Sequence, residues 1–197
     1  MTKMSFSAEY MSEMSKIIDL IDKDKIETLA TELEKVRASK GRIFFLGVGG
    51  SAANSQHAVN DFRKLASFEA YAPTDNVAEI TARTNDEGWE TVFVEWLKGS
   101  HLAASDCVFI LSVGGGNFEK RVSVNICNAI LHSKEIGAKV FGIVGKTDGF
   151  AYINADCCVA IPIVNQERIT PHAESFQAAI WHLLVSHPKL NTNRTKW

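Results

Sequence analysis

The sequence predicts an α/β fold in which a parallel sheet of five strands is covered by helices on both faces. Short apolar runs alternate along the chain with longer segments whose apolar residues recur every three or four positions. Strands of parallel sheets are buried on both faces and have this continuous apolar character, and helices connect them. Two glycine-rich loops follow two of the runs directly, at the strand ends where such sheets bind ligands.

The elements can be assigned in order along the chain, which we expect to form one domain over 1–197 with an N-terminal helical segment, 1–40. The expected helices are 7–39 with a polar break at 22–25, 52–66, a stretch containing 89–97, 122–136 and 171–186. The expected strands are 42–47, 69–72, 106–112, 139–144 and 157–161. Residues 188–197 form a polar tail that we expect to be disordered.

Composition and charge exclude several classes of protein. The chain has 197 residues, 46% of them hydrophobic, and a formal net charge of -2. This charge argues against partners bound through a basic surface, such as nucleic acid or a membrane surface. The N-terminus lacks the apolar stretch of a signal peptide, and no apolar run approaches the roughly 20 residues that cross a bilayer. The four cysteines have no CxxC spacing and fit buried, reduced thiols, so we expect a cytoplasmic protein.

The first glycine-rich loop joins the strand at 42–47 to the following helix. Gly49 and Gly50 let the backbone approach an anion, and Ser51 offers both a helix cap and a hydroxyl donor. The N–H groups and the dipole of the helix start would add to the attraction. The alternative is a tight strand-to-helix turn without a ligand. The loop lacks the third glycine of the dinucleotide fingerprint and the Lys-Ser/Thr pair of a P-loop.

The second glycine-rich loop follows the strand at 106–112. Gly114, Gly115 and Gly116 can form a backbone nest for an anion, and Ser112 and Asn117 add side-chain donors. Because the carboxyl ends of parallel strands share one sheet edge, the two loops together predict a phosphorylated ligand.

Four side chains on two helices are candidates for metal binding and acid–base chemistry. His57 and Asp61 are four residues apart and therefore share one helix face, and Glu174 and His182 are two turns apart on the last helix. Such a set could bind a divalent metal such as zinc, or transfer protons near neutral pH. The alternatives are an exposed helical pair for the first two residues and a core histidine for His182.

Two further sites are weaker candidates for substrate contact. His172 lies close to Glu174 at the start of the last helix and could contact a substrate. Asn85 and Asp86 precede a helical stretch, where they could form a helix cap or a polar lip of the ligand pocket.

These residues resemble the phosphoheptose isomerase branch of the SIS-domain family over nearly the whole chain. The resemblance rests on Gly47-Val-Gly-Gly-Ser-Ala-Ala-Asn-Ser-Gln-His57, Thr84-Asn-Asp-Glu-Gly88, the loop after Ser112, and Thr170-Pro-His-Ala-Glu174 with His182. It implies an SIS-type three-layer sandwich, a homotetramer with pockets between subunits, and a zinc site at His57, Asp61, Glu174 and His182. Asp61 and His182 would also be the proton-transfer residues.

The reaction implied by the resemblance is the isomerisation of sedoheptulose 7-phosphate to a heptose 7-phosphate, which would serve lipopolysaccharide or capsule synthesis. This chain has Asp61 where the family has Glu, Glu174 where it has Gln, and Val48 where it has Asn. Two hydroxyls of the family's phosphate loop are also missing from 112–117. Two other functions stay open: an isomerase of another ketose phosphate, and a non-catalytic protein that binds sugar phosphates or acts as a scaffold.

Overall fold

A five-stranded parallel sheet forms the centre of the computed structural model, which describes residues 4–195. The strands are β1 (Ile43–Leu46), β2 (Ala70–Tyr71), β3 (Cys107–Ser112), β4 (Lys139–Val144) and β5 (Cys157–Ala160). Their order in the sheet is β2-β1-β3-β4-β5. The chain therefore moves to one side of β1 first and to the other side afterwards, so the order reverses between β1 and β3.

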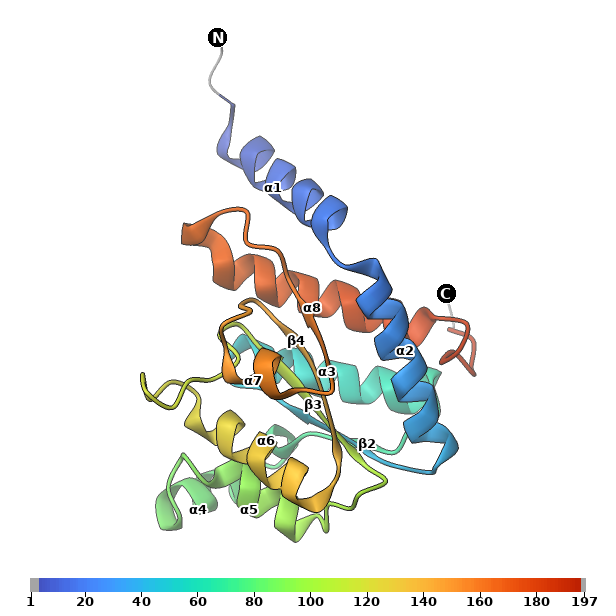
Figure 1. The fold of residues 1–197 in the computed structure, drawn as a ribbon, viewed down its shortest axis with the longest axis vertical. Coiled ribbons are helices and arrows are strands. Elements are labelled where there is room, and N and C mark those ends of the chain that lie inside the picture. The colour runs from blue at the N-terminus through green and yellow to red at the C-terminus, as the bar shows by residue number, and fades with distance from the viewer. Residues whose placement is uncertain (1–3, 196–197) are drawn as a thin grey trace.

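Helices cover both faces of the sheet (Figure 1). One apolar core joins the sheet to α2 (Lys23–Ala38), α3 (Gly50–Leu65) and α8 (Ile169–Ser186). A second core lies on the opposite face, under α5 (Val92–Gly99), α6 (Val124–Ile136) and α7 (Phe150–Asn154). The fold is thus the predicted three-layer α/β sandwich, and phenylalanines such as Phe45 and Phe109 stack across neighbouring strands, with ring centroids 5.0 Å apart.

The N-terminal helices are separated where the polar break was predicted. α1 (Phe6–Leu20) extends from the body of the molecule, and α2 begins after Asp22, whose carboxylate accepts a hydrogen bond from the Lys25 N–H (Figure 1). This cap satisfies one of the backbone donors that a helix start leaves free. The chain turns at Asp22 because α1 and α2 pack in different directions.

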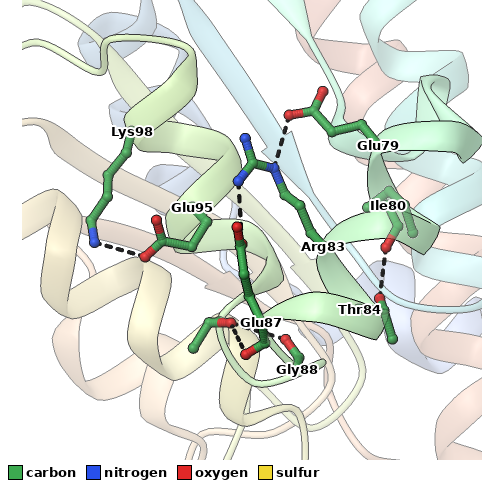
Figure 2. Close-up of polar contacts among 9 residues, drawn as sticks. Glu79, Ile80, Arg83, Thr84, Glu87, Gly88, Glu95 and Lys98 are labelled. Atoms are coloured by element: carbon green, nitrogen blue, oxygen red, sulfur yellow. Dashed lines mark hydrogen bonds and ion pairs between the residues drawn. The ribbon is translucent and has the colours of Figure 1, made fainter.

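Two helices were not expected from the sequence. α4 (Val77–Asp86) has no buried residue, and its Arg83 pairs with Glu79 on the same helix and with Glu87 just after it (Figure 2). A separate ion pair, between Lys98 and Glu95, lies on α5 (Figure 2). α7 has only five residues. Short 3-10 turns, η1 (Pro73–Asp75) and η2 (Gln166–Arg168), precede α4 and α8.

The expectation of a disordered tail is wrong for the described part of 188–197. Leu190 is fully buried, and the Arg37 guanidinium donates to the carbonyl oxygens of Lys189 and Leu190. The Thr192 N–H also donates to the Leu65 carbonyl at 2.8 Å. These contacts hold the tail against α2 and the end of α3, and residues 196–197 lie outside the described part.

The cysteines agree with the expectation of buried, reduced thiols. All four cysteines are free and buried, and burial raises the pKa of the Cys158 thiol to about 12. No helix within residues 4–195 has the length and apolar character needed to span a bilayer.

Candidate active site

A cleft of about 440 Å³ opens at the carboxyl edge of the sheet, between the loops that follow β1 and β3. This is the point where the strand order reverses, and ligands of open α/β sheets bind there. The predicted residues Ser51, Ser112 and Gly114 contribute to its wall. The other lining residues are Val48, Val113, Val122, Ser123, Lys146, Gln166, Glu167, Ile169 and Thr170.

The loop after β3 has a conformation that needs glycine. Gly115 and Gly116 have φ values of +73° and +82°, and a Cβ on Gly116 would lie 2.6 Å from the Cys127 sulfur. The Gly115 N–H donates to the buried Ser112 hydroxyl at 3.0 Å. Within the described part of the chain, the N–H groups of Gly114 and Gly116 have no acceptor, so both can donate to a ligand.

Asn117 lies at the far side of this loop, away from the cleft. Its backbone pairs with that of Val122, and its side-chain oxygen accepts from the Lys120 N–H at 2.7 Å. It lines a smaller hollow of about 110 Å³, which also contacts Gly114, Gly116, Lys120 and Lys146.

The loop after β1 leads directly into α3. Gly49 has a φ of +63°, and the helix begins at Gly50. The N–H groups of the first helical turn have no partner within the helix and face its N-terminal end, which is the end at the cleft. Ser51 is buried in the first turn. The Glu174 carboxylate lies against Gly50, where a Cβ would come within 2.5 Å of it, so a negative charge already sits beside this helix start.

Three of the four predicted metal ligands converge. His57, Asp61 and His182 each offer a ligand atom within 4.8 Å of the others. The Asp61 Oδ2 atom is 3.9 Å from His57 Nε2 and 3.8 Å from His182 Nε2. The histidine side chains are 59% and 50% exposed, whereas that of Asp61 is 14% exposed.

Neighbouring groups orient the side chains of this cluster. The His182 Nδ1 atom is 2.8 Å from the Ala178 carbonyl, a contact in which Nδ1 carries the proton and Nε2 is left with a lone pair. Asn60 donates to Asp61 Oδ1 at 2.7 Å, which leaves Oδ2 facing the imidazoles. The His57 ring packs edge-on against Trp181, with centroids 4.6 Å apart. Two imidazoles and a carboxylate are a donor set that suits zinc.

Glu174 does not join the cluster, contrary to the expectation of a four-residue site. It precedes His182 by eight residues, about 12 Å along a helix. Its carboxylate lies against Gly50, at the opposite end of α3 from Asp61.

His172 and the Asn85–Asp86 pair also lie elsewhere than expected. His172 is buried behind the cleft, where its Nε2 atom is 2.8 Å from the Glu13 carboxylate of α1, so it does not line the cleft. Asn85 and Asp86 end α4 instead of preceding a helix, and Asn85 donates to Asp86 on an exposed surface. In this chain they therefore do not cap a helix start, and neither one lines the cleft.

Lys146 is the charged cleft residue that sequence reasoning missed. It follows β4 by two positions, as the cleft residues Val48 and Gly114 follow β1 and β3. The same rule about strand ends would have found it.

The cleft and the cluster lie along one helix. Ser51 is six residues before His57 and ten before Asp61 on α3, which corresponds to about 9 and 15 Å. A ligand held at the cleft can therefore reach the cluster only if it is an extended molecule.

Comparison with known proteins identifies the family. The SIS domain family model matches residues 9–145. The chain is 30% identical to the phosphoheptose isomerase of Rhodospirillum rubrum over 149 residues, which cover 73% of each chain. It therefore belongs to the SIS domain family, among the phosphoheptose isomerases. The predicted resemblance is thus confirmed, and the protein is a sugar-phosphate isomerase.

The same family fold is found in solved structures. The phosphoheptose isomerase of Francisella tularensis superimposes with a TM-score of 0.78 at 19% identity, over 93% of this chain and 97% of that one. The phosphoheptose isomerase of Neisseria gonorrhoeae gives a TM-score of 0.76 at 21% identity, over 91% and 92%. At these identities the superpositions establish the SIS fold alone.

Proposed function

We propose that this SIS-domain isomerase converts sedoheptulose 7-phosphate to D-glycero-D-manno-heptose 7-phosphate through a cis-enediol. The observation that carries the proposal is the placement of the cleft and the His57–Asp61–His182 cluster along α3. A linear seven-carbon sugar phosphate with its phosphate in the cleft would extend along α3 toward the cluster. Relatives named phosphoheptose isomerase support this choice of sugar.

The phosphate would be bound by the residues around the two loops. The Ser51 and Ser112 hydroxyls and the free N–H group of Gly114 lie at the cleft, and the free N–H group of Gly116 lies at the adjoining smaller hollow. All four are donors that match phosphate oxygens. Gly49 and Gly115 provide the left-handed turns of the two loops, and the absence of a Cβ at Gly50 makes room for the Glu174 carboxylate. Asn117 would hold the loop from its far side.

Asp61 and His182 would transfer the protons. Isomerisation removes a proton from one carbon, returns it to the neighbouring carbon, and moves a second proton between the two oxygens. Asp61 Oδ2 is an acceptor at the centre of the cluster, and His182 Nε2 has a free lone pair while Nδ1 is bonded to Ala178. The Asp61 carboxylate and the His182 imidazole are 3.8 Å apart. At this separation the carboxylate can transfer the proton between the two carbons while the imidazole transfers the proton between the two oxygens.

His57, Asp61 and His182 also form the donor set that would hold a divalent metal, for which zinc fits best; a lone pair that binds the ion is not available to a proton, so each residue would have one of these two roles at a time. When bound, such an ion would act as a Lewis acid that stabilises negative charge on the substrate oxygens. Glu174 would stay outside this set, leaving the remaining position to substrate or water.

We further propose that the active protein is a cytoplasmic homotetramer. Apolar side chains on α1 are strongly exposed in the single chain, including Met11 at 65% and Ile18 at 54%. The cluster histidines are exposed as well, and a neighbouring subunit would exclude water from them.

The decisive test is incubation with sedoheptulose 7-phosphate, with and without zinc, followed by NMR of the product. We expect turnover that zinc increases, and a loss of about 100-fold or more in Asp61→Ala and in His182→Ala. His132→Ala, on α6 at the opposite face of the sheet, is the matched control and should keep the wild-type rate. Wild-type turnover in both Asp61→Ala and His182→Ala would refute the assignment. Turnover of a hexulose 6-phosphate alone would refute the choice of sugar.

A further inference from the structure

Lys146 is a cation without a partner at the cleft. Within the described part of the chain it makes no ion pair and no hydrogen bond, although it lines both the cleft and the smaller hollow. The preceding residue, Gly145, donates its N–H to the carbonyl oxygens of Ser112 and Val113, at 3.2 and 2.9 Å. These bonds hold the loop after β4 on the end of β3, so the base of Lys146 is fixed beside the glycine loop.

Glu174 places the opposite charge beside the first turn of α3, whose residue Ser51 lines the cleft. Its carboxylate lies against Gly50 at the start of α3, and it follows the cleft residue Thr170 by one turn of α8. No described residue donates a hydrogen bond to its carboxylate oxygens. The carboxylate thus occupies the place where a helix start would attract an anion.

The remaining charges near the cleft do not cancel this arrangement. Glu167 of η2 lies on the cleft wall, while Lys120 and Asp148 line the smaller hollow alone. A phosphate dianion entering the cleft meets free donors and a lysine at the β3–β4 side, whereas the carboxylate of Glu167 lies on the η2 wall and that of Glu174 lies beside the start of α3. Like charges repel and opposite charges attract over these distances, so the two sides are not equivalent.

We propose that Lys146 binds the phosphate of the substrate and that Glu174 repels phosphate from the start of α3, so that the two residues fix the direction of the bound sugar. The inference rests on the proposed function and deepens it. The phosphate lies at the ends of β3 and β4, in the cleft that the Ser51 hydroxyl also lines, and the carbon chain runs along α3 toward Asp61. The substrate class is then a monophosphate whose carbon chain is uncharged, because a carboxylate in the chain would meet Glu174.

Binding of inorganic phosphate, measured by calorimetry on the full chain, tests the inference without turnover. A hydrogen bond to a charged group is strong enough that Lys146→Met should weaken phosphate binding roughly 10-fold or more, and Lys146→Arg should restore most of it. Glu174→Gln should bind phosphate more tightly than wild type. Lys120→Met is the matched control, since Lys120 lines the smaller hollow only, and it should bind phosphate as wild type does.

Three results would overturn the inference: wild-type affinity in Lys146→Met, an equal loss in Lys120→Met, or unchanged affinity in Glu174→Gln. In kinetics with sedoheptulose 7-phosphate, Lys146→Met should raise KM more than it lowers kcat, because the lysine is remote from Asp61. A wild-type protein that does not isomerise this sugar, but loses phosphate binding in Lys146→Met, would refute the proposed substrate and leave the phosphate site standing.

Discussion

At the scale of single residues, the geometry of Asp61 depends on Asn60. The Asn60 amide donates to Oδ1, and this bond turns Oδ2 toward the two imidazoles. We predict that Asn60→Ala weakens zinc binding by about 10- to 100-fold, the usual effect of removing a group that orients a ligand. Competition with a chromophoric chelator measures the affinity.

Asn128→Ala is the control for that measurement. Asn128 donates to the Glu90 carbonyl on the other layer of the molecule, and its removal should leave zinc affinity unchanged. Equal zinc affinities in Asn60→Ala and wild type would show that the hydrogen bond from Asn60 is not needed to orient the Asp61 carboxylate.

The glycine loop offers a second prediction for single residues. Gly116→Ala combines an unfavourable φ of +82° with a Cβ 2.6 Å from the Cys127 sulfur, and should destabilise the protein by about 1–3 kcal/mol. Gly114→Ala meets nothing within 4 Å and has no positive φ, so it should leave stability unchanged. Urea denaturation of both variants checks this, and equal midpoints would contradict the strain argument.

At the scale of the elements, an ion pair joins the starts of β1 and β3. Asp106 accepts hydrogen bonds from the Arg42 side chain and from the backbone N–H groups of Arg42 and Ala103. Burial by itself would raise the pKa of Asp106, but these hydrogen bonds and the Arg42 charge outweigh it and lower the pKa.

This pKa shift predicts a pH dependence of stability. Because the pKa of Asp106 is lower in the folded protein than in the unfolded chain, the pair stabilises the fold above the unfolded pKa. That contribution is lost as the pH falls from about 4 through the folded pKa. Urea unfolding of wild type and Asp106→Asn should therefore differ at pH 7 and converge in acid; a difference independent of pH would contradict the linkage.

α1 is held to the start of α8 by a buried acid. Glu13 accepts hydrogen bonds from Asn165 and Arg168, both at 2.7 Å, and its other oxygen is 2.8 Å from His172. The hydrogen bonds from Asn165 and His172 lower the pKa of Glu13. Glu13→Ala should therefore speed the hydrogen exchange of α1 amides. Glu9→Ala, which removes an exposed partner of the same arginine, should change it little. Equal exchange in both variants would contradict the anchoring role.

At the scale of the whole molecule, the exposed side of α1 is a candidate for the proposed interface between subunits. Met11 and Ile18 are seven residues apart, so they lie on the same side of the helix. We predict that replacing both with lysine lowers the mass measured by sedimentation from that of the proposed tetramer, because charge would enter the proposed apolar interface. Ile153→Lys, equally exposed on α7, is the control. An unchanged mass in the α1 variant would exclude this side from the interface.

Most of the architecture could be predicted because strands and helices leave different periodic patterns. All five strands and the break at Asp22 follow from apolar runs and a capping residue. α4 was missed because it has no buried residue and therefore no apolar stripe, although Asn76 caps its start. The prediction that the tail is disordered was wrong because it relied on the polar composition of the segment, which contains an apolar residue, Leu190, that is buried and holds the tail in place.

The sequence by itself determined the sheet, the position of both glycine loops and the faces shared by His57 and Asp61, since these depend on residues near one another in the chain. Only the tertiary structure decided which residues of other elements lie against each helix face. The crossing of α3 and α8 brings His182 to Asp61, and it leaves Glu174 two turns away, beside Gly50. Helical spacing fixes the direction of a side chain but not its partner, because partners come from packing between distant segments.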